Sequence, residues 1–182
     1  MSVETERSML DRLNRRYDKW NGNGMRFTRA EHVKVTSGFD ARRICDYMVF
    51  DLWTGGSFNS EAAPKLHGHE VKISRADWLT EMKDPSKAEA FAQYCDYFWL
   101  VIADKAMVKD GELPRGWGLM VPRGDTVAVV KQATQRVDVL PMPRHLQATL
   151  TRAVTKTAIR LDRAGESSFE YVVPRGREPV TA

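Results

Sequence analysis

The sequence has only two cysteines, Cys45 and Cys95, and no long apolar run. Two cysteines are too few for a disulfide framework, so we expect a reducing compartment. No stretch reaches the length of a membrane-spanning helix, and the first residues lack the apolar core of a signal peptide. The sequence therefore predicts a cytoplasmic protein that makes no contact with a membrane.

The composition is that of a folded protein with a mild excess of basic residues. Hydrophobic residues make up 42% of the 182 residues, and charged residues make up 29%. We expect one main domain over residues 1–140, with residues 141–182 adding a helix and a basic tail that pack on it or extend from it. The formal net charge of +4 is compatible with binding to nucleic acid but does not require it.

An acid and a base lie close together in the segment LHGHEVKISRADW, residues 66–78. Side chains alternate along a strand, so Glu70 and Lys72 leave the same face. Val71 and Ile73 leave the other face, and the hydroxyl of Ser74 joins the polar one. Such a pair forms either a salt bridge or part of a catalytic site, and the two residues alone do not decide between them.

A second carboxylate lies on the preceding predicted strand, ICDYMVFDLW, residues 44–53. Asp46 shares a face with apolar residues, where a lone charge would be unfavourable unless a cation met it. If the two strands pair, Asp46 and Glu70 can converge on one Mg²⁺ or Mn²⁺ ion, since such ions prefer carboxylate oxygens and water. Lys72 would then stand beside an attacking water, which is an arrangement suited to phosphodiester hydrolysis.

Four segments follow one another along the chain: ARRICD, HEVKISRADW, KDPSKAEAFAQYCDYFWLVIAD and LPRGWGLMV. In this order they resemble the PD-(D/E)XK nuclease superfamily. Within it they are most similar to MmcB-like DNA repair proteins and their phage-encoded relatives. The resemblance covers roughly residues 41–132. It implies an α/β fold with a restriction-endonuclease-like αβββαβ core, in which helices flank a mixed central sheet and a C-terminal helical extension follows. If a phage encodes the chain, the expected location is the host cytoplasm.

The resemblance also implies roles for individual residues. Asp46 and Glu70 correspond to the metal ligands and Lys72 to the catalytic lysine, with the Val71 carbonyl as a further oxygen ligand. Cys45 stands where the family often has proline. The implied function is hydrolysis of DNA in repair, recombination or phage DNA metabolism, with Mg²⁺ or Mn²⁺ as cofactor. The alternatives are a catalytically silent protein that keeps the fold and binds DNA or a host protein, and a structural protein without affinity for nucleic acid; a homodimer is one of the assemblies left open.

Several other side chains are secondary candidates. Glu6, on a predicted helix over residues 4–18, corresponds to a family glutamate that reaches toward the metal, although an acid there also suits the helix dipole. Asp51 is an alternative ligand only if a bulge changes the strand register. Ser74 ends the lysine strand, and Gln93 lies on a following helix of the kind that often assists the site in this superfamily.

Basic residues around these segments are candidate phosphate contacts, and each could equally serve stability or solubility. They are Arg42, Arg43, Arg75, Lys83 and Lys87. His67 and His69, together with a cysteine, form a weaker candidate for zinc binding. The remaining pattern predicts a helix beginning at Trp78 and capped by Asp77, a helix over residues 86–95, a buried strand within residues 96–104 and a hairpin around residues 123–125. A last helix from residue 143 carries the apolar stripe Leu146, Leu150, Val154, Ala158 and Leu161, opposite a basic face of Arg144, Arg152, Lys156, Arg160 and Arg163.

Overall fold

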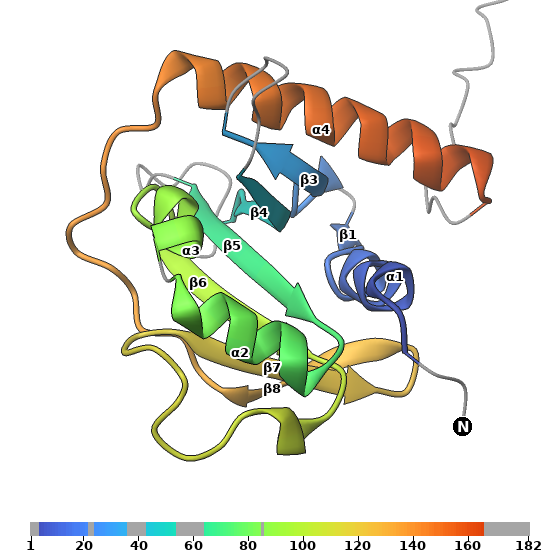
Figure 1. The fold of residues 1–182 in the computed structure, drawn as a ribbon. Helices are drawn as coiled ribbons and strands as arrows, with labels where there is room; N and C mark the ends of the chain where they lie inside the picture. Colours follow the sequence, from blue (N-terminus) through green and yellow to red (C-terminus); the bar gives the residue numbers. More distant parts are fainter. Residues whose placement is uncertain (1–3, 22–23, 36–42, 54–63, 85, 166–182) are drawn as a thin grey trace, which may run out of the picture.

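A six-stranded mixed sheet forms the centre of the computed structural model, which describes residues 4–21, 24–35, 43–53, 64–84 and 86–165 (Figure 1). The strands follow one another across the sheet in chain order: β3 Ala30–Lys34, β4 Ile44–Asp51, β5 Lys65–Lys72, β6 Tyr97–Ile102, β7 Gly118–Arg123 and β8 Thr126–Lys131. Strands β5, β6 and β7 are parallel, and the other neighbours are antiparallel. A separate hairpin joins β1 Trp20–Asn21 to β2 Gly24–Met25.

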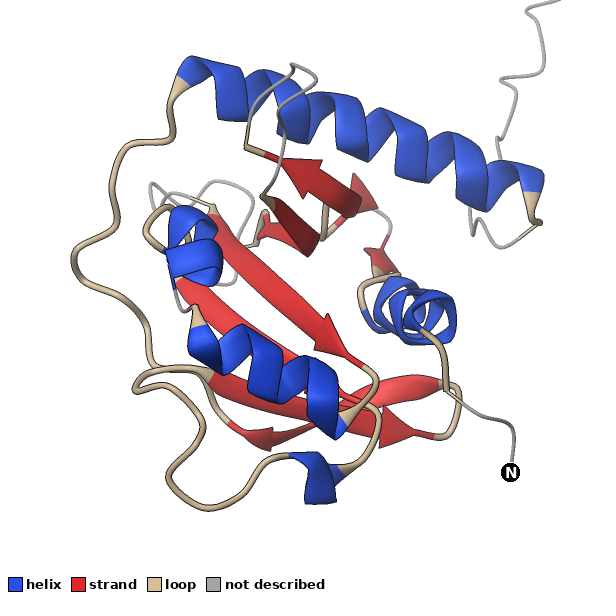
Figure 2. Cartoon of the chain, viewed as in Figure 1, coloured by secondary structure: helices blue, strands red, loops and turns tan. Residues whose placement is uncertain are grey.

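Four α-helices surround this sheet (Figure 2). They are α1 Glu6–Arg16, α2 Arg75–Lys83, α3 Ser86–Ala92 and the long α4 Arg144–Arg163, and a short 3-10 helix, η1, covers Lys105–Met107. The expected α/β class, mixed sheet and C-terminal helix are therefore confirmed. No helix in the described ranges is both long and apolar enough to cross a membrane.

The predicted start of α2 was wrong. Ser74, not Asp77, is the N-cap, and its hydroxyl accepts a hydrogen bond from the amide of Asp77. Both residue types can cap a helix, and the one three positions earlier does so here. Helix α2 therefore begins at Arg75, and Ile73, expected on the apolar face of the strand, lies beyond the end of β5 and is 40% exposed.

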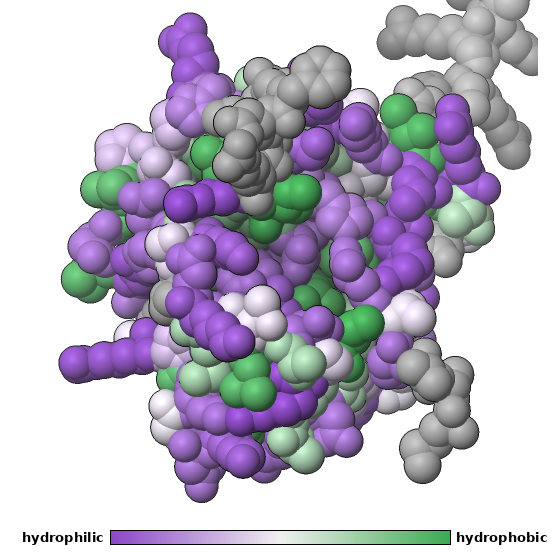
Figure 3. Space-filling model, in the orientation of Figure 1, coloured by the Kyte–Doolittle hydropathy of each residue, from purple (hydrophilic) through white to green (hydrophobic). Residues whose placement is uncertain are grey.

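The two faces of the sheet are covered by different helices. Helix α1 packs its buried residues Met9, Leu10 and Leu13 on one face, against side chains such as Trp99. Helices α2, α3 and α4 cover the other face, where Phe98 lies in the core. The aromatic run of β6 is thus core, as the sequence predicted, because both of its faces are covered. Polar residues cover most of the molecular face visible in Figure 3.

Helix α4 lies along β3, the edge strand of the sheet (Figure 1). Its threonines bond the strand's main chain: Thr149 donates to the carbonyl of Lys34 at 2.6 Å, and Thr157 accepts from the amide of Glu31 at 2.9 Å. An edge strand presents main-chain groups without a strand partner, and here hydroxyl groups satisfy two of them.

The predicted apolar stripe of this last helix was partly wrong. Leu146, Leu150 and Leu161 are buried, whereas Ala158 is exposed. Arg160, which was placed on the basic face opposite the stripe, instead lies 2.8 Å from the carboxylate of Glu31. The buried face is polar in part because it satisfies hydrogen bonds of the edge strand. Residues 166–182, including the predicted basic tail, lie outside the described residues.

Candidate functional site

Two acids face each other where the pairing of β4 and β5 stops. The last paired residues at this end are Tyr47 and His69, and one further step in this antiparallel register would place Asp46 opposite Glu70. Instead, the Oδ2 of Asp46 accepts a hydrogen bond of 2.8 Å from the amide of Val71. The strand register thus brings both predicted carboxylates to one end of neighbouring strands.

Lys72 lies between two carboxylates. Its Nζ is 2.6 Å from Oε1 of Glu70 and 3.0 Å from Oε2 of Glu81, which is on α2. The three side chains are largely buried, with side-chain exposures of 14% for Lys72, 9% for Glu70 and 11% for Glu81. Glu81 was not among the predicted site residues, because the contact between α2 and Lys72 depends on how the helix packs on the sheet, which no local pattern shows.

Burial changes the protonation of this cluster. It raises the pKa of Glu70 to about 8, with a further contribution from the negative charge of Asp46, and raises the pKa of Asp46 to about 6. Burial alone would lower the pKa of Lys72, but the charges of Glu70 and Glu81 outweigh it and raise that pKa above its ordinary value. Lys72 is therefore a stable cation, whereas the two carboxyls hold protons more readily than usual.

A cavity of about 200 Å³ opens beside this cluster, and Glu70 and Glu81 line it. The exposed residues Arg43 and Lys87 line the same cavity, and Arg43 also bonds the main chain and hydroxyl of Ser86. These two predicted phosphate contacts thus lie beside the carboxylates. Lys83 is exposed in the last turn of α2, and Arg42 lies outside the described residues.

Glu6 approaches the cluster from the first turn of α1. Its Oε1 lies 2.8 Å from Nε2 of His32, and its charge helps to raise the pKa of Asp46. His32 has a φ of 51°, a left-handed conformation that residues other than glycine rarely adopt. No local sequence pattern marks this unusual backbone conformation.

Two residues predicted near the site have other partners. Ser74 caps α2 and also donates to the carboxylate of Asp77 at 2.7 Å. Arg75 pairs with both carboxylate oxygens of Glu112 and donates to the carbonyl of Met107. The hydroxyl and the guanidinium thus help to fix α2 and the loop after η1, and a role for either residue at the site stays a prediction.

Two further candidates lie at the other end of the strands. Asp51 pairs with Arg26 through distances of 2.9 and 2.6 Å, and its strand partner is Lys65 at the start of β5. Gln93 follows α3, where its carbonyl accepts a hydrogen bond from the amide of Leu140. Asp51 does not join Asp46, because the strand register is regular from Tyr47 to Asp51 and places Asp51 at the opposite end of β4.

His67 and His69 are structural on the face covered by α1. His69 is fully buried, with Nε2 2.7 Å from the hydroxyl of Tyr17, and His67 accepts a hydrogen bond from Nε1 of Trp99. Burial lowers the pKa of His67 to about 4. Across the described residues, no group of three or more His, Cys, Asp or Glu side chains is arranged to hold a metal ion. The zinc alternative is therefore without a ligand set there.

The carboxylate cluster is where the predicted Mg²⁺ or Mn²⁺ ion would bind, although within the described ranges its acids do not form a group of three placed to hold a metal ion. Asp46, Glu70 and Glu81 can carry three negative charges against the single positive charge of Lys72. Burial is the main cause of the raised pKa values of Asp46 and Glu70, and for Glu70 the charges of Asp46 and Glu81 add to it. The predicted ligands, two carboxylates and the main-chain carbonyl of Val71, are of the oxygen type that Mg²⁺ and Mn²⁺ prefer, and the ion itself stays a prediction.

Comparison with known proteins places the fold but not the function. A search of solved structures finds a protein of unknown function from Silicibacter pomeroyi, with a TM-score of 0.51 and 16% sequence identity. The alignment covers 94% of this chain and 97% of that chain. At this identity the likeness shows a shared α/β fold alone. No family model matches the chain, and a search of curated proteins finds no match either.

Replacing Glu70 with glutamine is expected to make the protein more stable than wild type at alkaline pH, by about 1–3 kcal/mol. The folded-state pKa of about 8 exceeds the ordinary value of 4.5, so folding favours the protonated form. Wild-type stability should consequently fall as the pH rises from about 4.5 to about 8. Urea denaturation at about pH 5 and pH 8.5 measures this slope.

The variant Glu89→Gln is the matched control, because Glu89 is 52% exposed and pairs with Arg136 on the surface. It should keep the wild-type slope. Asp46, with its pKa raised to about 6, leaves a smaller slope at lower pH in the Glu70 variant. Equal pH dependence in Glu70→Gln and wild type would contradict the buried, proton-retaining state of Glu70.

Proposed function

We propose that the protein is a divalent-ion-dependent nuclease that hydrolyses DNA, with a PD-(D/E)XK-type site at the ends of β4 and β5. The observation that carries the proposal is the meeting of Asp46, Glu70 and Lys72, from neighbouring strands, beside an open cavity. The order of elements also supports the proposal, because that superfamily has the order αβββαβ. Here the corresponding elements are α1, β3, β4, β5, the pair α2 and α3 in place of one middle helix, and β6.

The residues have distinct tasks in this proposal. Asp46 and Glu70, with the Val71 carbonyl, would hold the ion. When bound, a divalent ion supplies charge for clamping a phosphate and lowers the pKa of water. Lys72 remains protonated because of its raised pKa, so its ammonium stabilises negative charge developing on the phosphate and orients water, and does not remove a proton.

Other residues position these groups and the DNA. Glu81 fixes the ammonium of Lys72 from α2, and the amide of Val71 fixes the carboxylate of Asp46. Arg43 and Lys87, exposed at the rim of the cavity, are placed to contact phosphates flanking the cleaved bond. Such contacts make binding weaken as salt increases.

The test is digestion of single-stranded, duplex and branched DNA with Mg²⁺, with Mn²⁺ and with a chelator. Wild type should cleave at least one of these DNA forms only with a divalent ion, and the double variant Asp46→Asn/Glu70→Gln should bind DNA without cleaving it. Binding without cleavage by wild type in every condition would favour the catalytically silent alternative. If wild type neither binds nor cleaves DNA at low salt, the nuclease proposal and the silent DNA-binding alternative are both wrong.

A further inference from the structure

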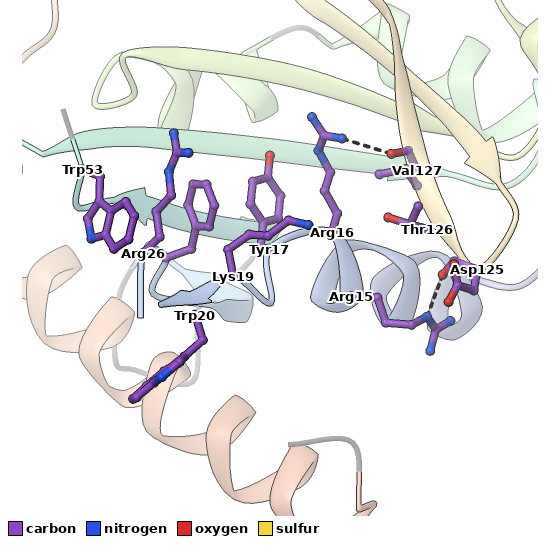
Figure 4. Close-up of a pocket in the computed structure, with 11 residues that line it drawn as sticks. Arg15, Arg16, Tyr17, Lys19, Trp20, Arg26, Trp53, Asp125, Thr126 and Val127 are labelled. Carbon is purple, nitrogen blue, oxygen red and sulfur yellow. Dashed lines mark hydrogen bonds between the residues drawn. The ribbon is translucent and has the colours of Figure 1, made fainter. Parts of the chain in front are cut away.

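A second cavity, of about 640 Å³, lies at the C-terminal end of α1 (Figure 4). Its walls come from the last turn of α1 and the residues after it, the hairpin β1–β2, the end of β4 and the start of β8. This volume is within the range of small-molecule sites in proteins. Tyr17, in its wall, belongs to the core on the face covered by α1, so the cavity lies across the sheet from the Glu70–Lys72 pair.

Positive charge dominates this cavity. Its described lining residues include four basic side chains, Arg15, Arg16, Lys19 and Arg26, and one acid, Asp125. Arg26 is neutralised by Asp51, at 2.6 Å. The other three form no ion pair with an acid within the described parts of the chain, which leaves a net positive site.

Two of these cations are held in place by main-chain carbonyls. Arg15 donates to the carbonyl of Asp125 at 2.6 Å, and Arg16 donates to that of Val127 at 3.1 Å. A carbonyl orients a guanidinium without removing its charge. Neutral hydrogen-bond donors would be enough to join α1 to the carbonyls at the start of β8. That structural role therefore does not explain why two arginines and a neighbouring lysine lie at one cavity.

Aromatic side chains form the other end of the cavity. Trp20 and Trp53 lie away from Arg15 and Arg16 in Figure 4, and the guanidinium of Arg26 lies 4.8 Å from the ring centre of Phe27. Trp20 is 57% exposed, which is high for the largest aromatic side chain. The cavity thus has an exposed indole at one end and, at the other, cations that pair with no acid among the described residues, which suits a ligand that is aromatic at one end and anionic at the other.

We propose that this cavity binds a nucleotide unit. The phosphate contacts Arg15, Arg16 and Lys19, and the base stacks on Trp20. A free mononucleotide and one nucleotide of a single strand share this chemistry. The site is separate from the carboxylate cluster, so the proposal does not depend on cleavage of DNA.

The experiment measures binding in a chelator, so that no cleavage interferes, with deoxythymidine monophosphate, deoxythymidine, inorganic phosphate and an unstructured oligothymidylate as probes. The monophosphate should bind about tenfold or more tightly than either the nucleoside or phosphate, because both ends of the ligand are recognised. Lys19→Glu and Trp20→Ala, at exposed side chains, should each weaken binding of the monophosphate and the oligonucleotide by about tenfold.

Lys105→Glu, an exposed lysine in η1, is the matched control and should leave binding unchanged. If the oligonucleotide binds much more tightly than the monophosphate, and both variants weaken its binding, the ligand of the cavity is a nucleic-acid single strand. Similar affinities assign it to a free nucleotide. The proposal is overturned if no probe binds at low salt, or if Lys19→Glu and Trp20→Ala bind as well as the control. Cleavage data bear only on the carboxylate cluster, so the two proposals fail separately.

Discussion

Replacement of Glu31 by leucine is expected to lower the free energy of unfolding by about 3 kcal/mol. The Glu31 side chain is only 6% exposed, and its carboxylate accepts hydrogen bonds from Arg7, at 2.8 and 2.6 Å, and from Arg160, at 2.8 Å. The buried amide of Asn14 also donates to it. One carboxylate thus joins α1, β3 and α4, and leucine would remove the acceptor that all three donors share.

The pH dependence of this loss separates charge from packing. Burial alone would raise the pKa of Glu31, but the hydrogen bonds from Arg7 and Asn14 outweigh it and lower the pKa to about 2. The stabilisation is therefore present above the ordinary value of 4.5 and is lost as the pH falls toward about 2. The difference between wild type and Glu31→Leu in chemical denaturation should shrink over that interval.

Glu89→Leu provides the control for the same substitution. Glu89 also pairs with an arginine, Arg136, but is 52% exposed, so this change should lower stability by less than about 1 kcal/mol. An equal loss in the two variants would show that the substitution itself, and not the buried network around Glu31, sets the effect.

Lys72→Ala is expected to reduce the proposed DNA cleavage by about 10³-fold, because the site loses the largely buried ammonium placed to stabilise charge on the phosphate. The same change leaves Glu70 and Glu81 without their cation, so the fold is weakened as well. The double variant Lys72→Ala/Glu81→Gln removes one of those charges and keeps the protein testable. Initial cleavage rates under saturating divalent ion, with folding checked by circular dichroism, measure the effect.

Lys87→Ala is the matched lysine, because it lines the same cavity from an exposed position. Its cleavage rate should fall by less than about tenfold, and its DNA binding should become less sensitive to salt. Wild-type cleavage rates in both Lys72 variants would remove the lysine from the proposed mechanism.

Much of the site was predictable because strand alternation is a local rule. Placing Glu70 and Lys72 on one face needed only their spacing, and the apolar neighbours of Asp46 marked it as a buried acid. The strand pairing that brings Asp46 to the amide of Val71 depends on contacts between segments 25 residues apart, which no local pattern encodes. The sequence therefore predicted the participants but not the geometry that holds them.

The parts that were missed involve residues whose partners lie far away in the chain. Thr149 and Thr157 are buried because β3 needs hydroxyl partners, so a stripe drawn from apolar residues alone could not include them. Glu81 reaches Lys72 from α2, through a contact between a helix and a strand that the helical pattern alone does not encode. The cavity at the end of α1 is built from four separate segments, and its arginines and tryptophans follow no shared spacing in the sequence.

The position of α4 along β3 bears on any attempt to shorten the chain. A fragment ending at residue 140 would leave the carbonyl of Lys34 and the amide of Glu31 without the hydroxyls of Thr149 and Thr157. It would also uncover the apolar surface beneath Leu146 and Leu150. An edge strand with unpaired main-chain groups can pair with strands of other molecules, so we expect such a fragment to self-associate.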